Sequence, residues 1–189
     1  LYYEGRDWAT YSARTTAEYL CVNNCGYTRV TDSDITTLRH RGRSDFLITY
    51  IFEGSSIFYL DGREQLVSQG QIAILKPQEP HYYISYAKDK PLSYWIHFTG
   101  TGVEKLLRSF GLWEQPVYNI GKHVEIENII MQILWEIRLK KPEYERMCAG
   151  HLMQLLSFLS RSAQLFNTAN NQNYKQLAPA IESMCNEYH

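Results

Sequence analysis

The stretch from residue 46 to residue 67, FLITYIFEGSSIFYLDGREQLV, decides how we expect this chain to fold. Its first run, FLITYIF, is apolar at successive positions, which indicates a strand that is covered on both faces. The second half contains Asp61-Gly62, a dipeptide that tolerates the positive φ angles of a tight turn, so FYLDGREQLV predicts a β-hairpin. A strand covered on both faces is typical of a barrel wall with helices packed outside and a filled or liganded cavity inside.

Short β-like runs continue on both sides of this stretch, from about residue 17 to residue 100. Turn segments such as EGSS, SQGQ and KPQEP separate them. Strands at this spacing predict an antiparallel sandwich or barrel. Besides FLITYIF and SIFYLDG within the stretch, the runs are YLCVN, QIAILKP, HYYISY and YWIHF.

The period of the apolar residues changes after Gly100. VEKLLRSFGL predicts a short amphipathic helix that ends at Gly111, and HVEIENIIMQILWEIRLKK predicts a longer one that Pro142 ends. A third helix is predicted from Glu143 to about Phe166. Its leucine stripe is wide enough to pack on the barrel and, along one edge, to form a dimer seam. The leucines expected at this seam are Leu152, Leu155, Leu156 and Leu159.

The end of the chain differs in composition from the rest. NTANNQNY, residues 167–174, predicts a linker, and KQLAPAIESMCNEYH then restarts helical spacing just before the sequence stops. We therefore expect a barrel in residues 1–100, helices that pack on it and form the dimer seam in residues 101–166, and a linker with the start of a further domain in residues 167–189. The last predicted helix has no partners, so we expect the chain to be the front part of a longer protein. The first residue is not methionine, so we expect residues upstream of it as well.

The overall composition excludes several classes of protein. The chain has 189 residues, of which 44% are hydrophobic and 21% are charged, and this is typical of a globular domain. Its formal net charge of -1 gives no basic field, so we expect any contact with DNA to come from another part of the protein. The sequence has neither a membrane-length apolar run nor a signal-peptide pattern, so we expect a cytoplasmic protein without membrane contact.

Common catalytic and metal-binding motifs are absent from the sequence. It contains no G-x-S-x-G, P-loop, H-E-x-x-H or G-x-G-x-x-G motif. His81 and His97 offer at most two imidazoles without a nearby carboxylate, which is fewer than the three protein ligands of a catalytic metal site. Cys21 and Cys25 form one C-x3-C pair with no second pair nearby. We therefore predict no metal, no cofactor and no enzymatic activity.

Alternation along SYWIHFTG, residues 93–100, divides the side chains between two faces. Ser93, Trp95 and His97 share one face, whereas Ile96 and Phe98 on the other suit packing against helices. The face of Trp95 combines polar and aromatic groups, which suits a cavity in which an indole covers the apolar face of a small ligand. The alternative is an aromatic core without a ligand.

Two further segments add candidate ligand contacts. HYYIS, residues 81–85, alternates so that His81, Tyr83 and Ser85 share one side, although His81 could equally be a residue at the barrel mouth bonded to backbone. The basic cluster LRHRGRSDF precedes the strand FLITYIF. Most such runs are solvated loops, but one arginine there could turn inward to bind a sugar hydroxyl or a carboxylate, and we expect Asp45 to pair with another.

The order of these motifs resembles the amino-terminal effector domain of AraC-family bacterial transcription regulators. The resemblance covers the chain from about Cys21 through the paired helices. It implies an α+β fold, in which a cupin-like, jelly-roll antiparallel β-barrel binds a small effector, often a sugar, and an α-helical hairpin forms a homodimer. KQLAPAIESMCNEYH looks like the first helix of that family's DNA-binding region. The motifs are R-x-x-G-R-x-D-F, Y-I-F-E-G, L-D-G-R, G-Q-I-A-I-L-K-P-Q-E-P-H-Y-Y and Y-W-I-H-F-T-G.

The resemblance also implies ligand contacts. Arg39 matches the sugar-contacting arginine of the family's arabinose-binding pattern, Tyr83 its pocket tyrosine and Trp95 its stacking tryptophan. Ser93 stands where that pattern has a histidine, and Leu20 stands about where it has a threonine, so the resemblance does not imply arabinose itself. Together with the alternation of HYYIS, the expected ligand-binding residues are Arg39, Tyr83, Ser93, Trp95 and His81.

These observations lead to one expected function and two alternatives. We expect an effector-sensing and dimerisation domain of a bacterial AraC-type transcription regulator that binds a sugar or another small metabolite. It would reach DNA through a downstream helix-turn-helix region that this sequence does not contain. The alternatives are a metal-free cupin that acts as a sugar-modifying enzyme, and a structural dimerisation module whose barrel is filled.

Overall fold

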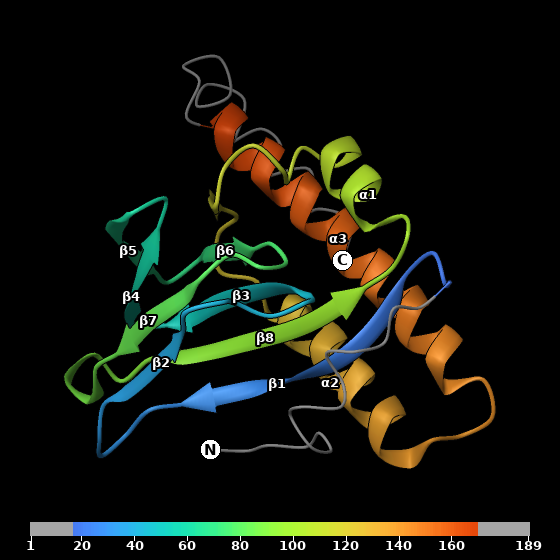
Figure 1. The fold of residues 1–189 in the computed structure, drawn as a ribbon, viewed down its shortest axis with the longest axis horizontal. Coiled ribbons are helices and arrows are strands. Elements are labelled where there is room, and N and C mark those ends of the chain that lie inside the picture. Colours follow the sequence, from blue (N-terminus) through green and yellow to red (C-terminus); the bar gives the residue numbers. More distant parts are fainter. Residues whose placement is uncertain (1–16, 170–189) are drawn as a thin grey trace, which may run out of the picture.

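The computed structural model describes residues 17–169 of the chain. Within this range, strands pair into two antiparallel sheets that face each other across a shared interior (Figure 1). In the five-stranded sheet the order is β1 (Cys21–Arg29), β8 (Leu92–Thr99), β3 (Phe46–Glu53), β6 (Gln71–Leu75) and β9 (Val117–Asn119). In the four-stranded sheet the order is β2 (Ile35–Arg39), β7 (His81–Ser85), β4 (Ser55–Leu60) and β5 (Arg63–Ser68).

The stretch that decided the sequence prediction forms β3, β4 and β5. Asp61 and Gly62 have φ angles of 52° and 74°, and they join β4 to β5 as the predicted hairpin turn. Along β3, Leu47 and Ile51 belong to the apolar cluster inside the barrel, whereas Ile48 belongs to the cluster beneath the helices. The expectation that this strand is covered on both faces is therefore confirmed.

Apolar side chains fill part of the interior between the sheets. They come from β3, β4, β5 and β6, and Tyr83, Trp95 and Val117 pack against them. This apolar cluster occupies one part of the barrel interior, and polar residues line the rest. Its buried members are Leu47, Ile51, Phe58, Leu60, Val67, Ala73 and Leu75.

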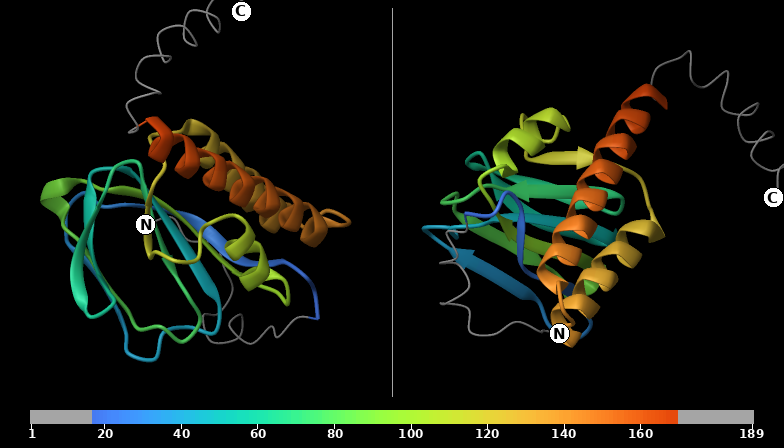
Figure 2. Two further views of the ribbon diagram at one scale, coloured as in Figure 1. Left: turned by 90° about the horizontal axis from the view of Figure 1, so that it is seen from above. Right: turned by 90° about the vertical axis from the view of Figure 1, so that its right-hand side faces the viewer.

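The helices lie outside the barrel. They are α1 (Val103–Ser109), α2 (Val124–Leu139) and α3 (Tyr144–Ala169), and a short 3-10 helix, η2 (Ala87–Asp89), precedes β8. Figure 2 shows α2 and α3 side by side across the outer face of the five-stranded sheet, where they contact β1. Ile96 and Phe98 are both fully buried in the same cluster as Ile133 and Leu155, so β8 anchors the helices as its alternation predicted.

The four leucines expected at a dimer seam pack within the chain. Leu152, Leu155, Leu156 and Leu159 have exposed fractions between 0% and 1%. Their surface is already removed from water by the barrel and by α2, so we correct their assignment: a dimer that uses these helices must bury other side chains. Dimerisation itself stays a prediction. The exposed large apolar residues of α2 and α3 are Val124, Trp135, Leu139, Met147, Leu165 and Phe166.

Some predictions for the ends of the chain lie outside the described residues. These are the predicted helix KQLAPAIESMCNEYH and all but the first residues of the predicted linker. The helix α3 continues to Ala169, past its predicted end at about Phe166. Within residues 17–169, none of the helices has the length and apolarity needed to cross a bilayer.

Candidate functional site

A cavity of about 120 Å³ lies between the two sheets, and we call it the inner cavity. It is smaller than the roughly 300–1,000 Å³ of typical sites for drug-sized ligands, so its volume restricts a ligand to a small metabolite. Four of the five residues predicted from the sequence line it, namely Arg39, Tyr83, Ser93 and Trp95. Six other lining residues were given no ligand role: Thr28, Ile35, Thr37, Thr49, Ser85 and His97.

Most residues that line the inner cavity lie at every second position along β2, β7 and β8. On β2, Ile35, Thr37 and Arg39 point inward at every second position, and they are less exposed than Thr36 and Leu38 between them. The sequence signal was the period of two along ITTLR, which is too short and too polar to reveal on its own which side faces inward. Only the pairing of β2 with β7 settles that side.

Trp95 is held in place by β1. Gly26 lies directly opposite Trp95, and a Cβ atom added to Gly26 would be 2.8 Å from Cζ2 of the indole. The indole Nε1–H donates a hydrogen bond of 3.1 Å to Oγ1 of Thr28. The absence of a side chain at Gly26 therefore lets the ring lie on the backbone of β1 while it lines the inner cavity.

We expect Gly26→Ala to destabilise the fold by about 1–3 kcal/mol, because the added methyl group overlaps the indole in a packed interior. Urea unfolding measures the change. Gly150→Ala is the matched control, since Gly150 lies in α3 and a Cβ atom added to it would meet no other atom within 4 Å. Alanine should stabilise that helix by about 0.5–1 kcal/mol. Equal stability of the two variants would contradict this account of Trp95.

Asp45 is the centre of a buried polar network beside the inner cavity. It is fully buried, and Arg43 donates two hydrogen bonds to its carboxylate, from Nε to Oδ1 at 2.7 Å and from Nη2 to Oδ2 at 2.9 Å. Asn23 donates to Oδ2 at 3.1 Å, and Thr99 donates to the Asn23 amide oxygen. Burial alone would raise the pKa of Asp45, but hydrogen bonds from His97 and Arg43 hold it well below its usual range.

His97 connects this network to the inner cavity. Its Nδ1 lies 3.1 Å from Oδ1 of Asp45, and burial lowers its pKa although Asp45 acts in the opposite direction. The imidazole is therefore neutral near pH 7. A carboxylate can only accept a hydrogen bond, so Nδ1 carries the proton and Nε2 is left as an acceptor. The sequence prediction that no carboxylate lies near the histidines is wrong. Asp45 directly precedes β3, and the pairing of β3 with β8 brings it next to His97.

His81 does not line the inner cavity. It is fully buried, and Nη1 of Arg39 lies 3.5 Å from its Nδ1, at the limit of a hydrogen bond. Burial, followed by the charge of Arg39, lowers the pKa of His81 to about 4. Arginine can only donate, so Nε2 carries the proton of His81, and this Nε2 has no hydrogen-bond partner among the described residues. A ligand role for His81 stays a prediction.

Comparison with known families identifies the fold that carries this cavity. Residues 27–156, more than half of the chain, match the AraC-like ligand binding domain. The chain belongs to this family. The match confirms the resemblance seen in the sequence and the α+β, cupin-like fold class, and it spans the inner cavity, α2 and the first half of α3.

Solved structures with similar folds share little sequence with this AraC-like domain. Apo ToxT from Vibrio cholerae is 12% identical, with a TM-score of 0.47 and coverage of 76% of this chain and 56% of that one. The EutQ protein of Clostridium difficile is 16% identical, with a TM-score of 0.33 and coverage of 43% and 59%. A cupin 2 conserved barrel protein from Leptotrichia buccalis is 16% identical, with a TM-score of 0.30 and coverage of 40% of each chain. The chain thus spans less than two thirds of each of these proteins, and no curated protein matches it.

The polar side chains that line the AraC-like domain's cavity offer hydrogen-bonding groups to a ligand. Among residues 17–169, no group of three histidine, cysteine, aspartate or glutamate side chains is placed to hold a metal ion. Arg43 already occupies both oxygens of Asp45, the carboxylate that His97 contacts. Leu20, which stands about where the arabinose pattern has a threonine, packs in the core beneath the helices and does not line the cavity.

Proposed function

We propose that this AraC-like domain is the effector-sensing part of a transcription regulator, and that its effector is a small polyhydroxylated metabolite such as a sugar. The observation that carries the proposal is the inner cavity, where Arg39, Tyr83, Ser93 and Trp95 meet in a domain of a ligand-binding family. Fold membership alone would support only the family, whereas this set of side chains supports the class of ligand.

The lining suits a ligand that has several hydroxyl groups and one apolar face. Thr37, Thr49 and Ser93 offer hydroxyls that both donate and accept hydrogen bonds, and Arg39 offers donors in a fixed fork. The indole of Trp95 supplies an apolar surface on which the carbon face of a sugar ring could lie. The cavity volume of about 120 Å³ favours a ligand no larger than a monosaccharide.

Strand β1 offers a route from the cavity to the helices. Thr28 lines the inner cavity and accepts the hydrogen bond of Trp95, while the other face of β1 contacts α2 and α3. An effector that binds one arrangement of β1 more tightly by about 1–3 kcal/mol would also shift the populations of the arrangements of α2 and α3. We propose that a homodimer and a DNA-binding region outside this sequence read that shift.

The experiment is a thermal-shift screen of the chain against monosaccharides and small metabolites, repeated with Trp95→Ala. A cognate effector should raise the melting temperature of the wild-type chain. Loss of the indole should weaken binding at least about tenfold and abolish the rise at the same concentration, because ring stacking is lost. Trp135→Ala is the matched control, since Trp135 is 51% exposed on α2, away from the cavity. An unchanged response in the Trp95 variant would refute this site assignment.

A metal-free cupin enzyme that acts on sugars is the second candidate, and the His97–Asp45 pair is the observation that favours it. A carboxylate that orients an imidazole through Nδ1 leaves Nε2 as a general base. Incubation of the chain with aldoses in D2O tests this candidate by NMR, because a base that isomerises or epimerises a sugar exchanges a carbon-bound proton with solvent. Exchange that disappears in His97→Gln would replace the sensing proposal with catalysis.

The structure supports only in part the alternative of a structural dimerisation module with a filled barrel. Apolar side chains do fill one part of the interior, but Trp95 borders a cavity rather than being enclosed by large side chains on all sides. A screen in which no metabolite shifts the melting temperature of the wild-type chain, at millimolar concentrations, would return the structural dimerisation module as the better explanation.

A further inference from the structure

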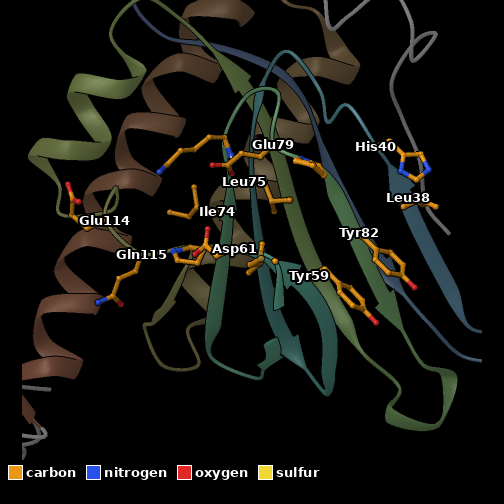
Figure 3. A pocket seen from close by; sticks show the side chains of 15 residues that line it. Leu38, His40, Tyr59, Asp61, Ile74, Leu75, Glu79, Tyr82, Glu114 and Gln115 are labelled. Atoms are coloured by element: carbon orange, nitrogen blue, oxygen red, sulfur yellow. The ribbon is translucent and has the colours of Figure 1, made fainter. Parts of the chain in front are cut away.

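A second and larger depression lies at the edge of the barrel, where outward-facing residues of β2, β4 and β7 meet buried residues of β4 and β6, and we call it the outer groove. It has a volume of about 740 Å³, within the roughly 300–1,000 Å³ of typical small-molecule sites. Figure 3 shows it reaching from Leu38, Tyr59 and Tyr82 on the strands of the four-stranded sheet toward Glu114 and Gln115. Its floor includes the buried side chains of Leu60, Ile74 and Leu75.

On β2 and β7, the outer groove and the inner cavity occupy opposite faces of the strands. Leu38 and Tyr82 line the groove, whereas their neighbours Thr37 and Tyr83 line the cavity. Aromatic pairs repeat this division: Phe58 and Tyr83 stack inside with ring centroids 4.9 Å apart, and Tyr59 and Tyr82 stack outside at 4.0 Å. The two sites have no lining residue in common, so ligands can be tested at each one separately.

Hydrogen bonds from backbone N–H groups hold two walls of the outer groove in place. The N–H group of Ile74 donates a hydrogen bond of 2.8 Å to the carbonyl oxygen of Pro116, which fixes the wall beside β6. The N–H group of Lys76 donates to Oε2 of Glu79 at 2.8 Å, which fixes the turn that follows. These hydrogen bonds hold two walls of the groove in place, and Leu38, which is 54% exposed, offers apolar surface for a ligand to cover.

Charged groups around the groove are predominantly acidic. The lining contains Asp61, Glu79 and Glu114 but only one ammonium group, that of Lys76. The Nζ atom of Lys76 lies 4.3 Å from the ring centroid of Trp113, and Arg108 pairs with Glu114 at 3.4 Å. Within residues 17–169, Asp61 and Glu79 form no ion pair.

We propose that the outer groove is a second small-molecule site and that it binds an amphipathic amine. The apolar body of the amine covers Leu38 and the Tyr59–Tyr82 stack, and its ammonium group lies toward Asp61 and Glu79. Charge complementarity selects a cation over an anion of the same shape, because two carboxylates there have no basic partner. This site is independent of the effector proposed for the inner cavity.

The test compares 4-phenylbutylamine with 4-phenylbutanoate, which have similar shape and opposite charge, by isothermal titration calorimetry on the chain. We expect the amine to bind roughly tenfold more tightly than the carboxylate at low ionic strength, and we expect this preference to shrink in high salt. Asp61→Asn combined with Glu79→Gln should remove the preference. Asparagine tolerates the positive φ of residue 61, so the turn should be kept.

Variants at apolar positions locate the binding. Tyr82→Ala should weaken the amine by roughly tenfold or more, because it removes half of the ring stack. Leu38→Ala, at an exposed position that tolerates truncation, should weaken the amine several-fold. Thr37→Ala is the matched control on the same strand, since Thr37 faces the inner cavity and should leave amine affinity unchanged.

Three results would overturn the proposal. They are no measurable binding of the amine, equal affinity for the amine and the carboxylate, and loss of amine affinity in Thr37→Ala with Leu38→Ala unaffected. None of them touches the effector proposal, which depends on the response of Trp95→Ala to metabolites. Conversely, a failed metabolite screen would leave amine binding at the outer groove intact.

Discussion

Asp45→Asn is expected to lower the free energy of unfolding by about 3–5 kcal/mol, the largest loss that we predict for a single substitution. The change keeps the volume of the side chain but removes its charge. Arg43, whose side chain is only 8% exposed, then keeps a buried guanidinium without its counter-charge. The amide NH2 group also turns a donor toward Arg43 or His97, which both donate to Asp45 in the native protein.

Urea unfolding followed by far-UV circular dichroism measures this loss. Glu53→Gln is the matched control, because it makes the same chemical change in the ion pair of Arg29 and Glu53, whose side chains are 49% and 39% exposed. Solvent screens that pair, so its loss should cost less than about 1 kcal/mol. Similar effects of the two substitutions would show that burial does not strengthen the Asp45 network.

Acid should weaken the fold, and His81 should account for about 3 kcal/mol of the loss between pH 6.5 and pH 4. Burial and the charge of Arg39 lower the pKa of His81 to about 4 in the folded chain, whereas in the unfolded chain it stays near 6.5. The unfolded state therefore binds more protons in this range. Stability contributed by neutral His81 is fully present above about pH 6.5 and is lost as the pH falls toward 4.

His97 and Asp45 also contribute to the loss of stability in acid. The pKa of His97 is also lowered by burial, and the pKa of Asp45 lies well below its usual range, so Asp45 adds a loss only below about pH 4. Arg39 and Arg43 also face His81 and hold its pKa down through their charge. The groups facing His81 therefore favour its neutral form, apart from Asp45, whose charge raises the pKa.

Urea unfolding at pH 7.5, 5.5 and 4.0 tests the contribution of His81. His81→Gln should show a shallower decline in the free energy of unfolding than the wild-type chain, because glutamine does not take up a proton. His40→Gln is the control for loss of one histidine, since His40 is exposed. A decline of the same steepness in His81→Gln would mean that His81 is not held neutral by its surroundings.

Much of the inner cavity could be predicted from sequence because β-strands alternate strictly. The inward placement of Ser93, Trp95 and His97, and the outward packing of Ile96 and Phe98, follow from a period of two along a single segment. Pairing of Asp45 with an arginine was also predicted, and the partner is Arg43, two residues away. Local spacing is sufficient wherever both partners lie on one strand or one turn.

Contacts between distant segments could not be predicted in this way. Asp45 and His97 are 52 residues apart and meet only because β3 pairs with β8 in one register. His81 has the inward parity that HYYIS indicated, yet it packs behind Arg39 instead of bordering the cavity. Parity states which face of a sheet a side chain occupies, but not whether a neighbouring side chain covers it.

The sequence by itself determined the strands, the Asp61-Gly62 turn, the change to helices after Gly100 and the family to which the chain belongs, because each depends on spacing within short segments. Tertiary structure alone decided that the helix leucines are buried within one chain, that Asp45 lies beside His97, and that a groove lined by Tyr59 and Tyr82 exists at the edge of the barrel. These features depend on strand register and on the volume left between packed elements, and neither quantity is encoded by the periodicity of any single segment.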